Sequence, residues 1–457
     1  MTIGCPVACA LVLGDDGGVP LASGSLGEAR GGYNAMDWTR RRFLESSAAL
    51  AANATAAVSS LRPEVPQYFG LDPFIEANRG AVFIRRTRVA HRRDAAGMRA
   101  EGLRLGREIF VPMDRPGIPI SHRVILKPNV LTRATAEGPE VNWGTDPDLY
   151  EGLLLALREL GLKKFHFAEA NYRTATSRSS SHYDDIHVRH GVEVCEPERR
   201  ARHYREGFEM NWSRPPEAVV YRQVPHYPPI NEPGTWLFNI AKWRSHGMCL
   251  TQACKNAQGL AVWPFQRFCS GWPMVTGVPD YMKPYICPDV VERITRYLES
   301  HRRMGYSRYQ STAPLGPLEQ EIWAHKTCDN LSVLKFGLSM IEAIYARNED
   351  PSDRVSEFLP NLVMFAKDPF RLDLVGLWLG GHEPGNVHFH RIAKERGLSD
   401  TFNPWEVPVY EWTEGRPVPR KLTDFPRTFL KTYYLQKEGE PRYHLVNEPF
   451  DYDRVKL

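Results

Sequence analysis

This sequence of 457 residues lacks long hydrophobic runs, C-x-x-C pairs and a strong net charge of either sign. No stretch of about 18 apolar residues is present, which argues against a transmembrane helix. The eight cysteines form no C-x-x-C pair, which argues against a zinc ribbon or ferredoxin-like cluster and leaves disulfides undetermined. Because 58 basic and 54 acidic residues leave a net charge of only +4, no nucleic acid or other polyanionic partner is expected.

The amino-terminal region has two parts. Residues 1–35 are rich in Gly and Ala and show no helical or strand period, which predicts a disordered leader or a mis-annotated start upstream of Met36. The TRRRFL segment at 39–44 resembles the twin-arginine export motif, and a weakly apolar stretch and the ATA triplet at 54–56 follow it. We therefore predict a twin-arginine signal over 36–56, the twin-arginine translocase as a partner, periplasmic export and no stable membrane insertion after cleavage. The alternative is a basic amphipathic helix of a cytoplasmic protein.

From residue 67 onward the pattern is typical of an α/β protein, and 42% hydrophobic residues suffice for a substantial core. A buried strand at 124–126, a helix from Pro147 and a strand at 165–167 form a strand–helix–strand unit, which implies parallel pairing. Further strands are predicted at 236–240, 361–365 and 407–412, and further helices at 94–107, 289–301, 330–347, 369–379 and 386–396.

These patterns predict an α/β fold with a mostly parallel sheet, helices on both faces and long loops rich in proline and aromatic residues. One large domain is expected over 67–412, as one body or two lobes. A carboxyl-terminal extension is expected over 413–457, with a hairpin of 432–436 and 443–446.

The stretch from Trp236 to Gly259 organises the chain. Its apolar start reads as a buried strand, and a cationic loop with Lys242, Arg244 and His246 is expected to follow. The stretch then predicts a short helix that is capped by Thr251 and ends at Gly259. Lys255 and Asn256 are expected in its first turns. A buried strand that leads into a helix start is a typical ligand site of open α/β sheets, and the helix start favours anions.

Four segments carry a family resemblance. Lys242-x-x-x-His246, Thr251 and Lys255-Asn256-x-x-Gly259 resemble the central signature of the domain of unknown function 362 family. VILKPN at 124–129, KFHFAEA at 164–170, and AKDPxxxD at 366–373 with its continuation to Gly397 are similar to other segments of that family, in the same order. The resemblance covers roughly residues 80 to 412 and implies a fold and a site, without a settled reaction.

Donor-rich residues fall at the ends of the predicted strands and at the start of one helix. Since the ends of parallel strands share one edge, we expect these side chains to line one crevice that holds a carboxylate or phosphate. His246 and Lys242 are the candidate catalytic residues, and His246 is the natural proton carrier. The candidate substrate-binding residues are Lys127, Asn129, Thr251, Lys255 and Asn256. The structural alternative is that Lys127 snorkels and His246 bonds a backbone carbonyl.

Two aspartates and a set of His and Cys residues complete the candidates. Asp368 precedes Pro369 and is expected to cap a helix, whereas Asp373, inside an apolar helix, is expected to meet a lysine or a cation. Metal or iron–sulfur ligation is the weaker hypothesis, because the spacing matches no compact motif. Its candidate ligands are His382, His390, Cys249 and Cys254.

Three functions are consistent with these features. The first is an exported enzyme that acts on a small anionic substrate in a crevice lined by Lys, His and Asn. The second is an iron–sulfur or metal-containing redox protein. The third is a non-catalytic exported binding protein that uses the same crevice.

Overall fold

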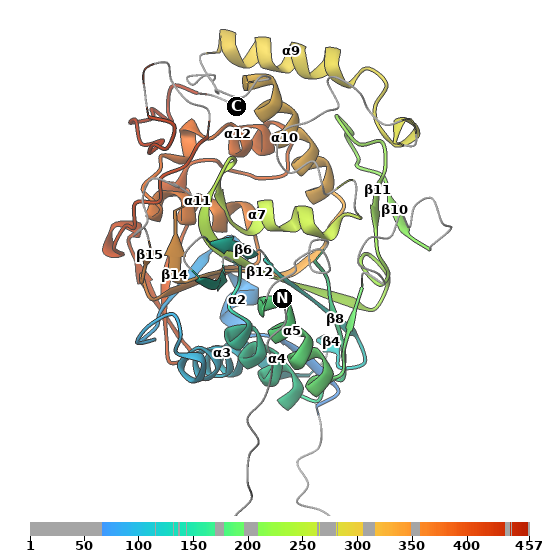
Figure 1. Ribbon diagram of the computed structural model, residues 1–457, viewed down its shortest axis with the longest axis vertical. Coiled ribbons are helices and arrows are strands. Elements are labelled where there is room, and N and C mark those ends of the chain that lie inside the picture. The colour runs from blue at the N-terminus through green and yellow to red at the C-terminus, as the bar shows by residue number, and fades with distance from the viewer. Residues whose placement is uncertain are drawn as a thin grey trace, which may run out of the picture. The chain divides into compact units, whose positions relative to one another are not determined.

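In the computed structural model, a central sheet lies between groups of helices (Figure 1). The described residues are 66–114, 116–130, 132–135, 138–142, 144–169, 178–195, 209–262, 265, 280, 282–304, 316–348, 357–434, 439 and 441–455. The predicted leader and signal, residues 1–56, lie outside them, as does most of the stretch 263–281.

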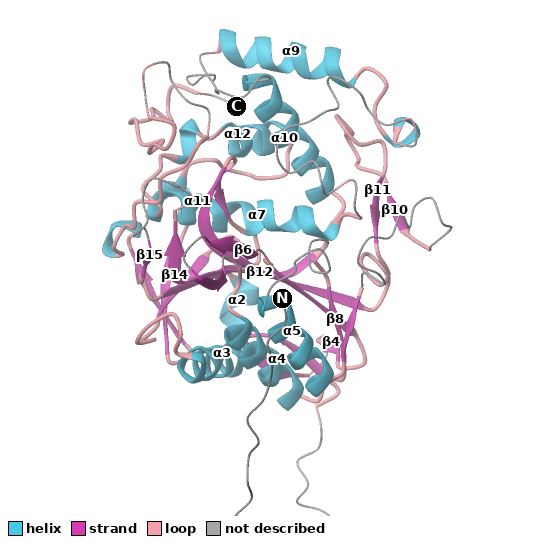
Figure 2. Ribbon diagram, viewed as in Figure 1, coloured by secondary structure: helices cyan, strands magenta, loops and turns pink. Residues whose placement is uncertain are grey.

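An 11-stranded sheet forms the centre of the fold, in the order β18-β17-β2-β16-β14-β12-β5-β8-β9, with β13 and β15 attached to β12 and β14 (Figure 2). The strands of this sheet are β2 (Val82–Arg86), β5 (Arg123–Pro128), β8 (Lys164–Phe167), β9 (Val192–Val194), β12 (Thr235–His246), β13 (Cys249–Thr251), β14 (Phe336–Arg347), β15 (Glu357–Phe358), β16 (Leu362–Ala366), β17 (Val409–Thr413) and β18 (Arg416–Arg420). The block β14-β12-β5-β8-β9 is parallel, whereas β16 runs antiparallel to both of its neighbours. The predicted α/β fold with a mostly parallel sheet is confirmed.

Helices cover both faces of the sheet, as expected. Alternating side chains of β12 pack into two separate hydrophobic clusters, one on each face of the sheet. Phe238 and Ile240 belong to one cluster, and Leu237 and Trp243 belong to the other. In Figure 1 one group of helices lies below the sheet and the other above it. The lower group is α3 (Ala95–Ile109), α4 (Pro147–Glu159) and α5 (Arg178–His190), and the upper group is α7 (Ala253–Asn256), α10 (Gly316–Leu331), α11 (Pro369–Leu379) and α12 (His388–Glu395).

Smaller elements surround this core. A three-stranded sheet joins β3, β1 and β4, and the pairs β10–β11 and β6–β7 are antiparallel. Their bounds are β1 (Tyr68–Leu71), β3 (Phe110–Met113), β4 (Ile118–Pro119), β6 (Thr132–Thr135), β7 (Gly138–Asn142), β10 (Asn211–Ser213) and β11 (Val224–His226), and two further helices are α2 (Pro73–Ala77) and α9 (Val290–Arg303).

The start of α4 follows directly from its sequence. The Asp146 carboxylate accepts hydrogen bonds from the amides of Asp148 and Leu149, and Pro147 occupies the first helical position. Gly152 lets α4 approach α3, because a Cβ there would lie 2.2 Å from the carbonyl oxygen of Arg99. The cap Asp146 and Pro147 therefore determine where α4 begins, and Gly152 determines how closely it packs against α3.

Two predictions about secondary structure are wrong. Residues 330–347 were expected to form a helix, but 336–347 form β14, a central strand preceded by α10. Its apolar run is buried on both faces, so it shows no strand alternation in the sequence. The cationic loop after Ile240 is likewise strand, because β12 continues to His246 with its last eleven residues buried.

The carboxyl-terminal residues pack back on the core. Amides of Thr428 and Leu430 donate to the carbonyls of Leu379 and Gly380 at 2.8 and 3.0 Å. Within the residues that the structure describes, the expected hairpin is reduced to one antiparallel bridge, Thr432 to His444.

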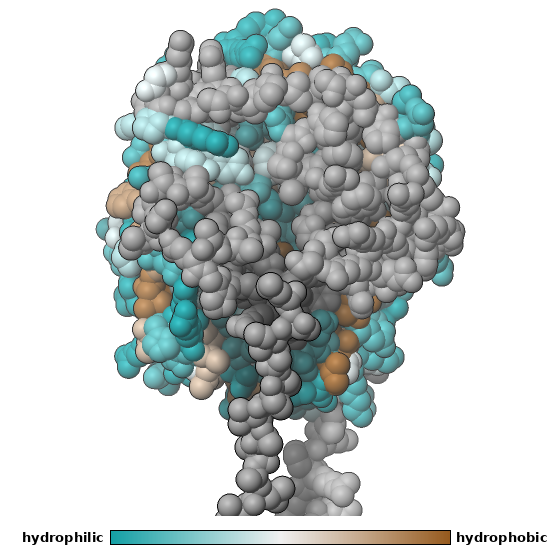
Figure 3. Space-filling view, in the orientation of Figure 1, coloured by the Kyte–Doolittle hydropathy of each residue, from teal (hydrophilic) through white to brown (hydrophobic). Residues whose placement is uncertain are grey.

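The visible described surface is mostly hydrophilic, with isolated hydrophobic residues (Figure 3). No helix in the described ranges is long and apolar enough to cross a membrane.

Candidate functional site

The carboxyl end of β5, beside the middle of β12, marks a topological switch point. From β5 the chain moves outward to β8 and β9, and from β12 it moves the other way to β14. Thr145 bridges the end of β5 and the middle of β12, since its Oγ1 donates to the carbonyl of Ile240 at 2.6 Å and accepts from the amide of Asn129 at 2.9 Å. Open α/β sheets place their ligands at such a point.

A buried Lys–Glu pair lies beside this point. Lys242 Nζ donates to Glu342 Oε2 at 2.5 Å, and the two residues are direct neighbours in the register of β12 and β14. The same carboxylate accepts from the amide of Asp146 at 3.3 Å and, through Oε1, from the amide of Ile344 at 3.1 Å. The ring of Tyr345 lies 3.1 Å from the Lys242 nitrogen. Strands β12 and β14 and the start of α4 therefore converge on one charged cluster.

Asp146 is the titratable member of this cluster. Burial and the neighbouring Glu342 carboxylate together raise the pKa of the Asp146 carboxyl to about 7, against the opposing effect of the Lys242 ammonium. Its Oδ1 makes both capping bonds, and no described residue donates to Oδ2. Burial also lowers the pKa of Lys242, although Glu342 opposes that shift. Near neutral pH, both the protonated and the ionised form of the Asp146 carboxyl are populated.

Asn129 supplies a second unusual group at the same edge. Its side chain is buried, and its Oδ1 has no hydrogen-bond donor within the described part of the chain. Buried polar atoms are rarely left without a partner, so this oxygen indicates a place for a donor from outside the fold.

Lys127 belongs to a different network on the opposite face. It is fully buried, and its Nζ donates to Glu169 Oε2 at 2.6 Å, Asn256 Oδ1 at 3.1 Å and the Pro128 carbonyl at 2.7 Å. Asn256 in turn donates to Asn239 Oδ1 at 2.8 Å. Burial lowers the pKa of Lys127, and the Glu169 carboxylate opposes the shift. All three donors of this ammonium are used, so it crosslinks β5, β8 and α7.

Gly259 was expected to end the helix, but α7 ends at Asn256, and Gly259 packs directly against this network. A Cβ at this position would lie 2.6 Å from Glu169 Oε1 and 3.0 Å from Lys127 Nζ. A side chain would therefore collide with the ion pair.

The start of α7 already holds a carboxylate. Asp373 of α11 accepts from the amides of Ala253 and Cys254 at 2.8 and 3.0 Å. Burial raises the pKa of Asp373 to about 7, and these hydrogen bonds oppose the rise. The free helix start expected as an anion site is thus occupied from within, and Asp373 meets backbone amides instead of a lysine.

Of the predicted residues near α7, Lys255 and Asn256 lie on the helix as expected, whereas Thr251 does not cap it. Thr251 is a residue of β13, Gln252 is the cap position, and the buried Thr251 Oγ1 has no partner among the described residues. Lys255 is half-buried on α7, directly before Asn256. The expected role of Thr251 as a cap is wrong.

His246 lies at the end of β12, where that strand pairs with β13. Its Nδ1 accepts from the amide of Met248 at 3.1 Å, its ring centroid lies 5.0 Å from that of Trp323, and its carbonyl accepts from Thr432. These contacts join β12 to α10 and the carboxyl-terminal segment, which is a structural role.

The four candidate metal ligands are all buried. His382 bonds the Leu430 carbonyl with one ring nitrogen and the Val446 amide with the other, at 2.7 and 3.0 Å. Burial lowers the pKa of His382 and His390 to about 3 and raises those of the Cys249 and Cys254 thiols. Within the described ranges no group of three or more His, Cys, Asp or Glu residues is placed to hold a metal ion.

The structure thus divides the predicted site. Lys242 lies in one network, Lys127 and Asn256 in another, and Asp368 caps α11 as expected, by accepting from the amides of Phe370 and Arg371. The sequence reading missed Glu342, which lies in a segment assigned to a helix, and it did not include Asp146 among the candidate site residues.

Comparisons with protein-family models, with curated proteins and with solved structures found no match for this chain. The resemblance to the domain of unknown function 362 family stays a prediction.

Proposed function

We propose that this protein is an enzyme that transfers a proton to or from a small polar substrate at the carboxyl end of β5, beside β12. The observation that carries the proposal is the junction of Asp146, whose pKa lies at about 7, with the buried Lys242–Glu342 pair. A general acid or base is most effective when its pKa is close to the working pH. An ion pair with a purely structural role does not require a neighbouring carboxyl group that titrates near neutral pH.

Each residue of the cluster has a distinct part in this reaction. Asp146 Oδ2 takes the proton, the electron pair of the broken bond stays on the substrate, and the reverse step returns the proton. The ammonium of Lys242 stabilises the negative charge that develops. Glu342 is a positioning residue, since it holds Lys242 Nζ at 2.5 Å and the Asp146 amide at 3.3 Å.

The substrate class follows from charge and from the unpaired Asn129 oxygen. Lys127 and Lys242 each hold a glutamate, so proton transfer is better supported than capture of an anion by these lysines. Small polar molecules, anionic and neutral, are therefore the class to test, with a donor group that Asn129 Oδ1 accepts.

Two further parts of the proposal rest on sequence motifs alone. The order of motifs in 36–56 supports export by the twin-arginine translocase to the periplasm. Four segments in order support membership of the domain of unknown function 362 family.

The test combines binding with isotope exchange. The full chain is screened by thermal shift against small carboxylates, phosphates and neutral polar compounds, and each hit is incubated with the protein in D₂O. Mass spectrometry then measures deuterium incorporation. Wild type should catalyse exchange, and Asp146→Asn should bind the same hit but exchange it at least about 100-fold more slowly.

The matched control is Asp368→Asn, because Asp368 caps a helix before a proline in the same way and touches no Lys–Glu pair. It should exchange like wild type. Binding without exchange by wild type would instead identify a non-catalytic binding protein. Iron and visible colour in anaerobically purified protein would favour the redox alternative.

A further inference from the structure

A cavity of about 550 Å³ opens at the amino-terminal half of β5 and β12, on the side of the sheet that carries α7. Its floor includes Ile125 and Leu237, which pair with each other across β5 and β12. They precede Lys127 and Asn239 by two residues along each strand and therefore lie on the same face of the sheet. Lys127 does not line the cavity. The space is therefore separate from the proton-transfer cluster, which lies on the other face.

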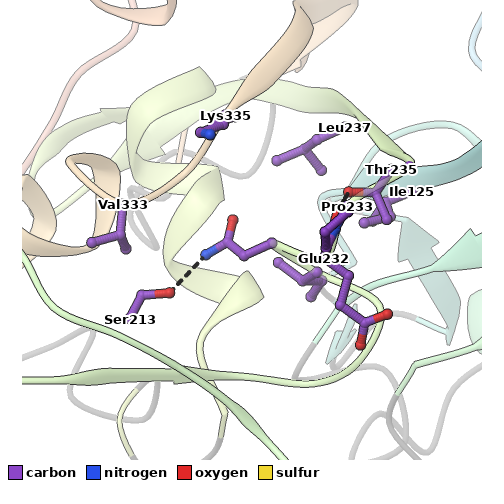
Figure 4. Close-up of a pocket in the computed structure, with 11 residues that line it drawn as sticks. Ile125, Ser213, Glu232, Pro233, Thr235, Leu237, Val333 and Lys335 are labelled. Atoms are coloured by element: carbon purple, nitrogen blue, oxygen red, sulfur yellow. Dashed lines mark hydrogen bonds between the residues drawn. The ribbon is translucent and has the colours of Figure 1, made fainter.

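The walls are about equally apolar and polar. Figure 4 shows Val333 and Lys335, from the connection between α10 and β14, across from the residues of the two strands. Ile230 extends the apolar wall. At the polar end Asn231 Nδ2 donates to Ser213 Oγ at 3.2 Å.

The charge around this cavity is uneven. Glu232 lines it, but its carboxylate already accepts from Arg123 at 2.7 Å and from Asn211 at 3.1 Å. Lys335 is exposed and forms no ion pair with any described residue. Among the described residues that line the cavity, Lys335 thus presents a positive charge without an ion-pair partner, beside the apolar side chains of Ile125 and Leu237.

We propose that this cavity binds a small amphipathic anion, with an apolar chain or ring on the floor and one carboxylate at Lys335. A volume of about 550 Å³ lies within the range of small-molecule sites. Such a charge-assisted contact also fixes the orientation of the ligand. The polar end at Ser213 and Asn231 accepts a second polar group of the ligand.

The probe is decanoate, and isothermal titration calorimetry on the full chain measures its binding. Saturable binding at one site is expected, with at least about tenfold weaker affinity for Lys335→Ala. Val333→Trp fills the cavity and should abolish binding. Lys164→Ala, an exposed lysine at the amino end of β8 outside the cavity, is the matched control and should bind like wild type.

Each comparison can overturn the proposal. Absence of saturable decanoate binding contradicts it. Equal affinity of wild type and Lys335→Ala, or equal binding of decanol and decanoate, contradicts the role of the anion. Lys335→Ala changes an exposed side chain, so its result does not depend on tolerance of Val333→Trp by the fold. Loss of proton transfer in Asp146→Asn should leave decanoate binding unchanged, which separates this proposal from the proposed function.

Discussion

Lys127 and Lys242 point to opposite faces of the same sheet. Lys127 lies beside Asn239 in the register of β5 and β12, and Lys242 follows Asn239 by three residues of regular strand. Successive strand residues alternate between faces, so an odd separation places the two lysines on opposite sides. Glu169 holds one ammonium and Glu342 holds the other. Two separate networks therefore replace the single cationic crevice that the sequence suggested.

The Lys127–Glu169 pair should be important for stability. Lys127→Met leaves a buried carboxylate without its cation and should lower the free energy of unfolding by about 3–5 kcal/mol. The double variant with Glu169→Leu should cost less than the sum of the two single variants, because it removes both charges. Urea unfolding measures the stability of the two single variants and of the double variant. The control is Arg107→Met at the exposed Arg107–Glu159 pair, which should have little effect on stability. Strict additivity would show that the pair is not coupled.

Asp373 should stabilise the start of α7. Asp373→Ala leaves two buried amides, those of Ala253 and Cys254, without an acceptor and should cost more than about 2 kcal/mol. Asp373→Asn keeps one acceptor oxygen and should cost less. Thermal and urea unfolding rank the two variants, and the same cost for both would contradict the capping role.

Asp146 should make the stability of the fold depend on pH. Its pKa is raised from 3.8 to about 7 in the folded state, so the native protein holds this proton more tightly than the unfolded chain does. The resulting stabilisation is complete below about pH 4 and is lost as pH rises through about 7. Asp146→Asn keeps the cap and removes this titration.

The measurement is urea unfolding of wild type and Asp146→Asn between pH 4 and 8. The stability of the variant relative to wild type should rise with pH by at most about 1.4 kcal/mol per unit and level off above about pH 7. A difference that does not change with pH would show that Asp146 titrates normally.

Export should depend on the arginine pair at the amino terminus. Arg40→Lys with Arg41→Lys should leave the full-length protein in the cytoplasm, because the twin-arginine motif would be lost. Cell fractionation with an antibody to the folded chain measures this. Undiminished recovery of the double variant from the periplasm would refute the predicted signal.

Local signals in the sequence predicted much of the fold. The helix at 369–379 was placed at its observed bounds, because Asp368 and Pro369 define its start. The strands at 124–126, 165–167 and 236–240 lie within β5, β8 and β12, since short buried apolar runs between turns favour strands.

The site could be predicted only in part, because its geometry depends on strand order and on strand length. Glu342 lies 100 residues after Lys242, and only the adjacency of β12 and β14 brings them together. The run 336–347 has no alternation and was read as helix, so its one carboxylate was not considered. The extent of β12 was equally hidden, and it decides which face Lys242 takes.

The most direct test of the account is the pKa of Asp146 itself. Carbon-13 NMR of protein labelled at the aspartate carboxyls, titrated from pH 4 to 9, measures it, with Asp146→Asn and Asp373→Asn identifying the two resonances. The account predicts that the resonance lost in Asp146→Asn titrates with a pKa of about 7. Titration of that resonance below about pH 5, near the ordinary value for an aspartate, would contradict the proposed acid–base role.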